Sequence, residues 1–152
     1  IGMGGSPVAG AVPGFVRNLS ASRTTEALDG LQTISRNAIA SADQHTQAES
    51  FPPGVELTPV EVPRGVRVTD PPGTWDHLTW RALGFQLAHD HAYSFRFDSS
   101  HDRGTDVARF AARAHGDLDG DGSLSTFEVR GQREPGRPAE VMAGLLVSRE
   151  LE

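Results

Sequence analysis

The first third of the chain carries the clearest helical pattern, over residues 13–49. Apolar residues there mostly recur three or four positions apart and form one stripe, while charged residues lie on the opposite side. Pro13 suits the first turn of such a helix. The pattern predicts one long one-sided helix, which needs a broad surface to lie against. The stripe consists of Phe15, Leu19, Leu28, Leu31, Ile34, Ala38 and Ala42.

A proline-rich segment follows over residues 50–74. Two short stretches inside it, 60–62 and 66–68, place valines on alternate positions. Alternation of this kind predicts edge strands, which tolerate neighbouring prolines better than central strands do. The rest of the segment is expected to be an extended loop.

Residues 75–152 have the pattern of a β-rich head. Apolar and polar residues alternate over 93–97, 110–114 and 124–129, which predicts three strands. A turn rich in Asp and Gly joins the last two as an antiparallel hairpin. The apolar tail over 141–151 predicts a final strand or a short helix. The predicted fold class is α+β, with the long N-terminal helix packed on an antiparallel sheet of about four strands.

The domain organisation follows from these patterns. Residues 1–12 are uncharged and rich in small residues, which predicts either the remnant of an N-terminal apolar segment or a flexible tail. Residues 13–152 predict a single domain made of helix 13–49, loop 50–74 and head 75–152. No stretch reaches the roughly 18–20 apolar residues that a membrane-spanning helix needs.

Composition narrows the classes of function. The chain has a net charge of −6 and contains no Lys and no cluster of Arg, which argues against a nucleic-acid partner. The absence of Cys excludes disulfides, thiolate metal sites and a Cys nucleophile. Gly and Pro are frequent and apolar residues make up 37%, so we expect a small core with much loop.

Residues 117–128 contain the sharpest local motif. Aspartates at positions 1, 3 and 5, Gly122 at position 6 and a glutamate at position 12 reproduce the spacing of an EF-hand calcium loop. Carboxylates this close repel one another unless a hard cation, water or hydrogen bonds separate them. The glutamate is the weakest candidate, because its side chain can point away from the loop if it lies in a strand. The candidate Ca²⁺ ligands are Asp117, Asp119, Asp121, Ser123 and Glu128.

The same residues also suit a metal-free turn, because Asp and Gly are common turn formers. A complete EF-hand needs a helix on each side of its loop, and Gly131 and Pro135 follow too soon for a long second helix. A Ca²⁺ site at a hairpin tip and a metal-free turn both stay open. A single EF-hand-like calcium-binding module stays an alternative function.

Two stretches together resemble the type IV pilin family. Residues 12–17, Val-Pro-Gly-Phe-Val-Arg, resemble the point where a pilin helix leaves the membrane. Residues 22–34 resemble the exposed half of that helix, with its Ser-x-x-x-Glu-Ala and Leu-x-x-Ile patterns. Residues 80–85, 93–95 and 110–127 look like the head of one group of bacterial pilin-like proteins, in which an acidic loop follows a strand.

The resemblance implies a structural, non-enzymatic subunit of a bacterial type IV pilus-like filament or secretion pseudopilus at the cell surface. It implies contact with other pilin subunits through the N-terminal helix, and with the inner membrane before assembly only if a full apolar segment exists. Residues 1–12 depart from the family. They do not form a continuous apolar segment, and they lack the glutamate that the family carries near the start of its mature chain. The implied assembly face comprises Phe15, Leu19, Leu28, Leu31 and Ile34.

A secreted hydrolase is a further alternative. The His-Asp-His sequence at 89–91 and the His-Asp pair at 101–102 flank the first predicted head strand and could converge on a metal, or could be solvated loop residues. Trp75 and Trp80 suit either a sugar-binding platform or the head core. We find no nucleophile motif and no phosphate-binding loop, so no enzymatic activity is expected.

Overall fold

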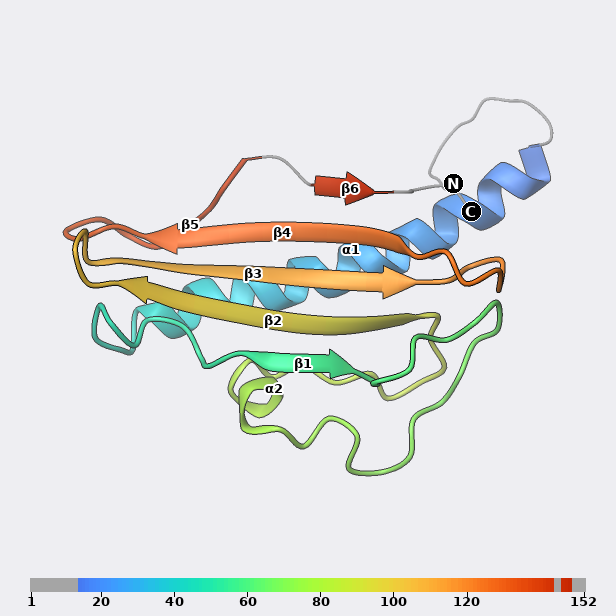
Figure 1. Cartoon of the computed structure of the whole chain (residues 1–152), viewed down its shortest axis with the longest axis horizontal. Helices are drawn as coiled ribbons and strands as arrows, with labels where there is room; N and C mark the ends of the chain where they lie inside the picture. Colours follow the sequence, from blue (N-terminus) through green and yellow to red (C-terminus); the bar gives the residue numbers. More distant parts are fainter. Residues whose placement is uncertain (1–13, 144–145, 149–152) are drawn as a thin grey trace.

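The computed structural model describes residues 14–143 and 146–148, with side chains from residue 24 to residue 143. The strands form one antiparallel sheet in the order β1-β2-β3-β4-β5, and β6 also pairs with β4. Figure 1 shows α1 crossing behind the sheet and α2 lying beside β1. The elements are α1 (Gly14–Ala42), β1 (Val55–Thr58), α2 (Leu78–Ala82), β2 (Tyr93–Asp102), β3 (Val107–Gly116), β4 (Ser125–Arg133), β5 (Glu140–Val141) and β6 (Leu146–Ser148).

Strands β2, β3 and β4 form the body of the sheet, and their side chains alternate between its two faces. On the buried face, Phe95 lies opposite Ala114, which lies opposite Phe127, so that rings alternate with a small residue. The other face is polar. There Arg113 donates to Glu128 Oε1 over 2.5 Å. The alternation therefore gives the sheet one face for the core and one for solvent.

The part of α1 from Thr24 to Ala42 packs on the buried face, chiefly against β3 and β4. Its buried residues recur three or four positions apart, and most of them are alanines, which lets the helix approach closely. The approach is tightest at Gly30, where a β-carbon would lie 2.5 Å from the ring of Phe95. The buried apolar residues of this segment are Ala27, Leu31, Ile34, Ala38 and Ala42.

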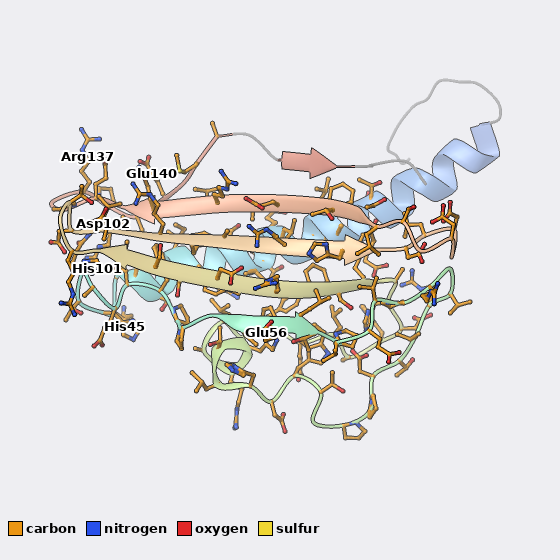
Figure 2. All side chains as sticks on the ribbon, in the orientation of Figure 1. His45, Glu56, His101, Asp102, Arg137 and Glu140 are labelled. Carbon is orange, nitrogen blue, oxygen red and sulfur yellow. The ribbon has the colours of Figure 1, made fainter. Side chains whose placement is uncertain are left out.

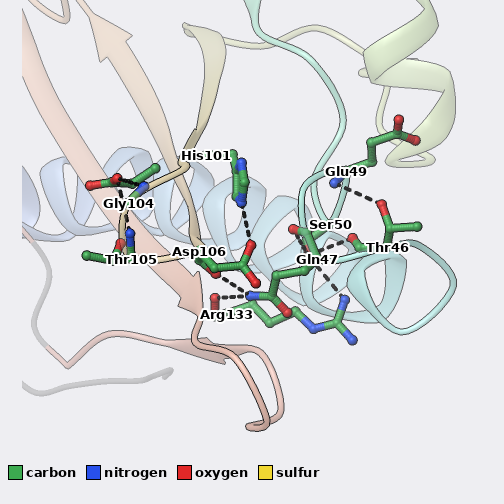
Figure 3. A network of polar contacts seen from close by, with 10 residues as sticks. Thr46, Gln47, Glu49, Ser50, His101, Gly104, Thr105, Asp106 and Arg133 are labelled. Carbon is green, nitrogen blue, oxygen red and sulfur yellow. Dashed lines mark hydrogen bonds and ion pairs between the residues drawn. The ribbon is translucent and has the colours of Figure 1, made fainter.

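The C-terminal end of α1 is fixed by the last residue of β4. Arg133 Nη1 donates to the carbonyl of Ala42 over 2.8 Å and to Ser50 Oγ over 3.1 Å, so a positive charge meets the helix C-terminus. Gln47 Nε2 donates to the carbonyls of Asp106 and Arg133 over 3.0 and 2.7 Å. Figure 3 shows how this network holds the helix end against the β2–β3 hairpin.

A second part of the core lies between β1, α2 and the loops around them. Trp80 is fully buried, and its Nε1 donates to Thr58 Oγ1 over 2.9 Å. The Trp75 ring packs beside it, with 5.3 Å between ring centroids, and donates to Asp70 Oδ2 over 2.8 Å. The same carboxylate oxygen lies 2.7 Å from His91 Nε2. Both tryptophans are therefore core residues and form no exposed platform.

The predicted fold class is wrong. The structure is mainly β, with a six-stranded sheet in place of about four strands and no long helix over 13–49 packed on it. α1 ends at Ala42, and its N-terminal turns extend past the ends of the strands in Figure 1. Helical periodicity overestimated the packed length because it reports a repeating pattern and not the extent of the surface opposite. The additional strands have two to four residues, too few to show an alternation.

The predicted edge strands at 60–62 and 66–68 do not form. The first strand lies upstream at β1, whereas Val60 and Val66 are exposed in loops and Val68 makes only a single bridge with His91. The prolines at 59 and 63 interrupt a ladder because they have no N–H to donate. In the predicted tail, β5 and β6 are strands, while residues 144–145 and 149–152 lie outside the described part, as does the predicted segment 1–12.

We expect Gly30→Ala to destabilise the protein, although alanine is the better helix former by about 1 kcal/mol. The added β-carbon would overlap the Phe95 ring, and overpacking of this kind costs about 1–3 kcal/mol. Thermal or urea unfolding measures the net effect. The matched test repeats the substitution in a Phe95→Leu background, where the overlap is removed and the alanine should be neutral or stabilising. If Gly30→Ala alone stabilised the otherwise wild-type protein, the close contact between helix and sheet would be contradicted.

Candidate metal site

The acidic loop joins β3 to β4 at one end of the sheet, with Gly116 and Ser125 as the last paired residues. Gly120 and Gly122 have φ values of 76° and 90°, in the left-handed region that glycine adopts readily. These two positions let the chain turn back within a short loop. The loop is therefore a hairpin tip between two strands, with neither flanking helix of an EF-hand.

Asp117, Asp119 and Asp121 come together in this loop. One carboxylate oxygen from each lies within 4.8 Å of the others, so the three could hold one cation. Each carboxylate also accepts a backbone N–H from further along the loop. Asp117 Oδ2 accepts from Gly122 over 2.9 Å, Asp119 Oδ1 from Asp121 over 3.1 Å, and Asp121 Oδ1 from Ser123 over 2.7 Å. These hydrogen bonds fix the direction of all three carboxylates.

Asp117 differs from the other two because it is buried, with 2% of its surface exposed. Its Oδ2 accepts from Gly122 and lies 3.7 Å from Arg64 Nε. Its Oδ1 is also buried, and no described residue donates a hydrogen bond to it. Burying a carboxylate oxygen without a partner is unfavourable. A hard cation coordinated by Oδ1 would satisfy this oxygen.

The structure does not bring Glu128 to the cluster. Three residues of extended strand separate it from Ser125, which places it about 10 Å along β4 at ~3.3 Å per residue. It lies on the polar face of the sheet and pairs there with Arg113 and Arg130. Ser123 lies in the loop, where its backbone N–H donates to Asp121. Of the four predicted carboxylate ligands, the cluster therefore contains the three aspartates, and Ser123 as a ligand stays a prediction.

The predicted assembly face is divided. Leu31 and Ile34 are buried in the core, while Leu28 is partly exposed at the edge of an open groove. The side chains of Phe15 and Leu19 lie outside the described part of the structure. Of the face that the sequence predicted, Leu28 and Leu31 line this groove, and Leu28 is the more exposed of the two.

The histidines are not brought together. His91 precedes β2 and His101 lies near its far end, so about 33 Å of strand separates them at ~3.3 Å per residue. His91 is buried between Asp70 and the Tyr93 carbonyl, whereas His101 Nε2 lies 2.7 Å from Asp106 Oδ1. Figure 2 labels His101 at the β2–β3 hairpin, at the opposite end of the sheet from the acidic loop. The two groups have separate partners.

Sequence reasoning missed two residues that shape these sites. Arg64 reaches the acidic loop from the segment between β1 and α2, where Gly65 N–H also donates to the Asp117 carbonyl over 2.7 Å. Asp70 comes from the same segment and holds His91. Both partners are far away in sequence, so no local pattern could have indicated these contacts.

Comparison of the chain with protein families, curated proteins and solved structures finds no match. Among the helices that the structure describes, none combines the length and the apolar character needed to cross a membrane.

We expect Glu128→Gln to lower stability at pH 7 by about 1–3 kcal/mol and to weaken its pH dependence. Burial alone raises the pKa of the Glu128 carboxyl, but hydrogen bonds and charge from Arg113 and Arg130 lower it by more. Because its pKa is lower in the folded protein, the carboxylate stabilises fully above its ordinary pKa of 4.5, and this contribution disappears as the pH falls through the lowered value.

Urea unfolding between pH 7 and pH 2 measures both effects, with the exposed Glu61→Gln as the control. Equal acid dependence in wild type and Glu128→Gln would show that this network contributes nothing.

Proposed function

We propose that this protein is a non-enzymatic structural subunit of a bacterial type IV pilus-like filament or secretion pseudopilus, acting at the cell surface. The order of sequence motifs supports the proposal: a helix with the pilin pattern precedes a β-rich head whose acidic loop follows a strand. The partners in this proposal are other copies or related subunits, contacted through α1.

An open groove between α1 and the β4–β5 edge carries the proposal. Its volume is about 670 Å³, and one wall comes from residues of α1. Val141 and the neighbouring Met142 are each more than 40% exposed beside it. Covering this surface would remove apolar area from water and so favour association. The apolar lining is Leu28, Leu31, Ile39, Val129, Ala139 and Val141.

The occupant we propose is the N-terminal segment of a second copy. Residues 1–16 carry no charged side chain, so they would bring no side-chain charge into the groove. A groove that takes a segment from another copy makes a heterologous contact. Contacts of this kind produce open filaments when the rotation between copies does not close a ring.

A specific observation favours a second role in the same protein, calcium binding by the acidic loop. The buried Asp117 Oδ1 has no hydrogen-bond donor among the described residues and belongs to a cluster of three carboxylates. Asp117, Asp119 and Asp121 would supply the protein ligands. The ion would fix the hairpin tip and supply no chemistry to a substrate, so its role would be structural.

The two alternative functions receive less support from the geometry. An EF-hand-like module needs helices beside the acidic loop, and β3 and β4 occupy those places. A hydrolase built on the histidines needs them to converge, and His91 and His101 lie at opposite ends of β2.

We expect the protein to be mainly monomeric at micromolar concentration and to associate weakly near millimolar concentration. A small interface predicts a dissociation constant on the order of 10⁻⁴–10⁻³ M. Sedimentation velocity over a concentration series measures it. Val141→Asp should weaken association at least several-fold, because it places a charge in the groove. Val60→Asp is the matched control, since Val60 is 80% exposed in a distant loop. Equal association of all three proteins would count against the groove.

We expect Ca²⁺ to raise the melting temperature. A dissociation constant on the order of 10⁻⁴–10⁻³ M is typical of weak extracellular sites. At a Ca²⁺ concentration ten times this dissociation constant, binding to the folded state raises the free energy of unfolding by about 1.4 kcal/mol. For a domain of this size, that raises the melting temperature by roughly 3–6 °C. Melting curves with Ca²⁺ and with chelator measure the shift, which Asp119→Asn should abolish and the exposed Asp43→Asn should preserve. An unchanged wild-type midpoint at several times 10⁻³ M Ca²⁺ would mean that the loop is a metal-free turn.

A further inference from the structure

Arg64 lies over the acidic loop. Its Nε is 3.7 Å from Asp117 Oδ2, and 71% of its side chain is exposed. A β-carbon added to Gly122 would lie 3.8 Å from Arg64 Nη2, so the guanidinium extends across the turn of the loop. This guanidinium is therefore a positive charge that the described structure places beside the acidic loop, in ion-pair contact with Asp117.

The backbone holds Arg64 at this position independently of its side chain. Gly65 N–H donates to the Asp117 carbonyl over 2.7 Å, and Arg64 and Asp117 form a parallel bridge. A β-carbon on Gly65 would lie 3.2 Å from the Gly120 backbone nitrogen, so the two segments are in close contact. The guanidinium can therefore leave the aspartates while its segment stays attached to the loop.

The ion pair itself is weak. Its charged atoms are 3.7 Å apart and the arginine is mostly solvated, and exposed ion pairs of this kind contribute little to stability. One guanidinium also leaves Asp117 Oδ1 without a donor among the described residues. A divalent cation carries twice the charge and accepts several oxygen ligands at once. The two cations would share the Asp117 carboxylate and would repel each other.

We propose that Arg64 is a resident counter-ion that Ca²⁺ displaces from the acidic cluster, and that it thereby sets the affinity of the site. This inference rests on the calcium site proposed above. A unit charge and a divalent ion roughly 6 Å apart in water-like surroundings repel enough to change a dissociation constant about tenfold. Physiological salt screens part of this repulsion and reduces the effect to several-fold.

Isothermal titration of the full chain with CaCl₂ tests the proposal. The variants are Arg64→Ala and Arg64→Gln, the second of which keeps a long polar side chain. Arg103→Ala is the matched control, because it removes the same charge from an exposed position on the β2–β3 hairpin, at the other end of the sheet. Both Arg64 variants should bind Ca²⁺ about three- to tenfold more tightly than wild type, and the difference should shrink as NaCl rises. Arg103→Ala should match wild type.

Each contrary result has a distinct meaning. Equal or weaker binding by both Arg64 variants would overturn the displacement of Arg64 and leave the calcium site in place. Equal tightening in Arg103→Ala would also overturn it, since the effect would then come from net charge. No binding by wild type or any variant, with melting midpoints unmoved by Ca²⁺, would remove the site itself. Melting curves in chelator establish that each variant is folded before it is titrated.

Discussion

The close contact between Gly30 and the Phe95 ring sets the distance between α1 and the sheet. The ring is fully buried and packs against the edge of Phe85, with 5.2 Å between ring centroids. The small side chains of Ala27 and Ala38 continue this close contact along the helix. The helix packs on β3 and β4 and also contacts β5, and the groove opens between the helix and the β4–β5 edge. The surface proposed for association is thus a consequence of where the helix packs.

The extended backbone on both sides of the acidic loop decides what the calcium-loop motif becomes. In a helix, a residue seven positions after Asp121 would turn back toward the loop, because the rise is only ~1.5 Å per residue. In β4 the same residue, Glu128, is carried away from the tip and joins arginines on the polar face of the sheet. The three aspartates remain at the turn, where backbone N–H groups orient them. The aspartates at positions 1, 3 and 5 of the motif therefore stay together, whereas the glutamate at position 12 is separated from them.

The sequence predicted those elements whose pattern is local. The alternation over 93–97, 110–114 and 124–129 is confirmed by β2, β3 and β4, and the hairpin at the Asp-Gly turn is confirmed as well. The packed extent of the helix and the short strands could not be read from periodicity, because both depend on surfaces supplied by distant residues. The same limit explains why Arg64 at the acidic loop and Asp70 beside His91 were missed. Burial in the loop also had no local sign: the three aspartates look alike in sequence, yet Asp117 is buried and the other two are exposed.

Strand β4 connects the three features on which the proposals depend. It begins at the acidic loop, its middle contributes Val129 to the groove, and its last residue, Arg133, binds the C-terminal end of α1. A slip of one residue in its register would turn Glu128 toward the helix and Phe127 toward solvent, since strand side chains alternate. The loop between β3 and β4 helps to prevent that slip, because its length and its two left-handed glycines fix the pairing of Gly116 with Ser125. An ion held by Asp117, Asp119 and Asp121 would tighten that same loop. Ion binding would therefore act first on the stability of the β3–β4 hairpin. It would affect the groove only indirectly, through that hairpin.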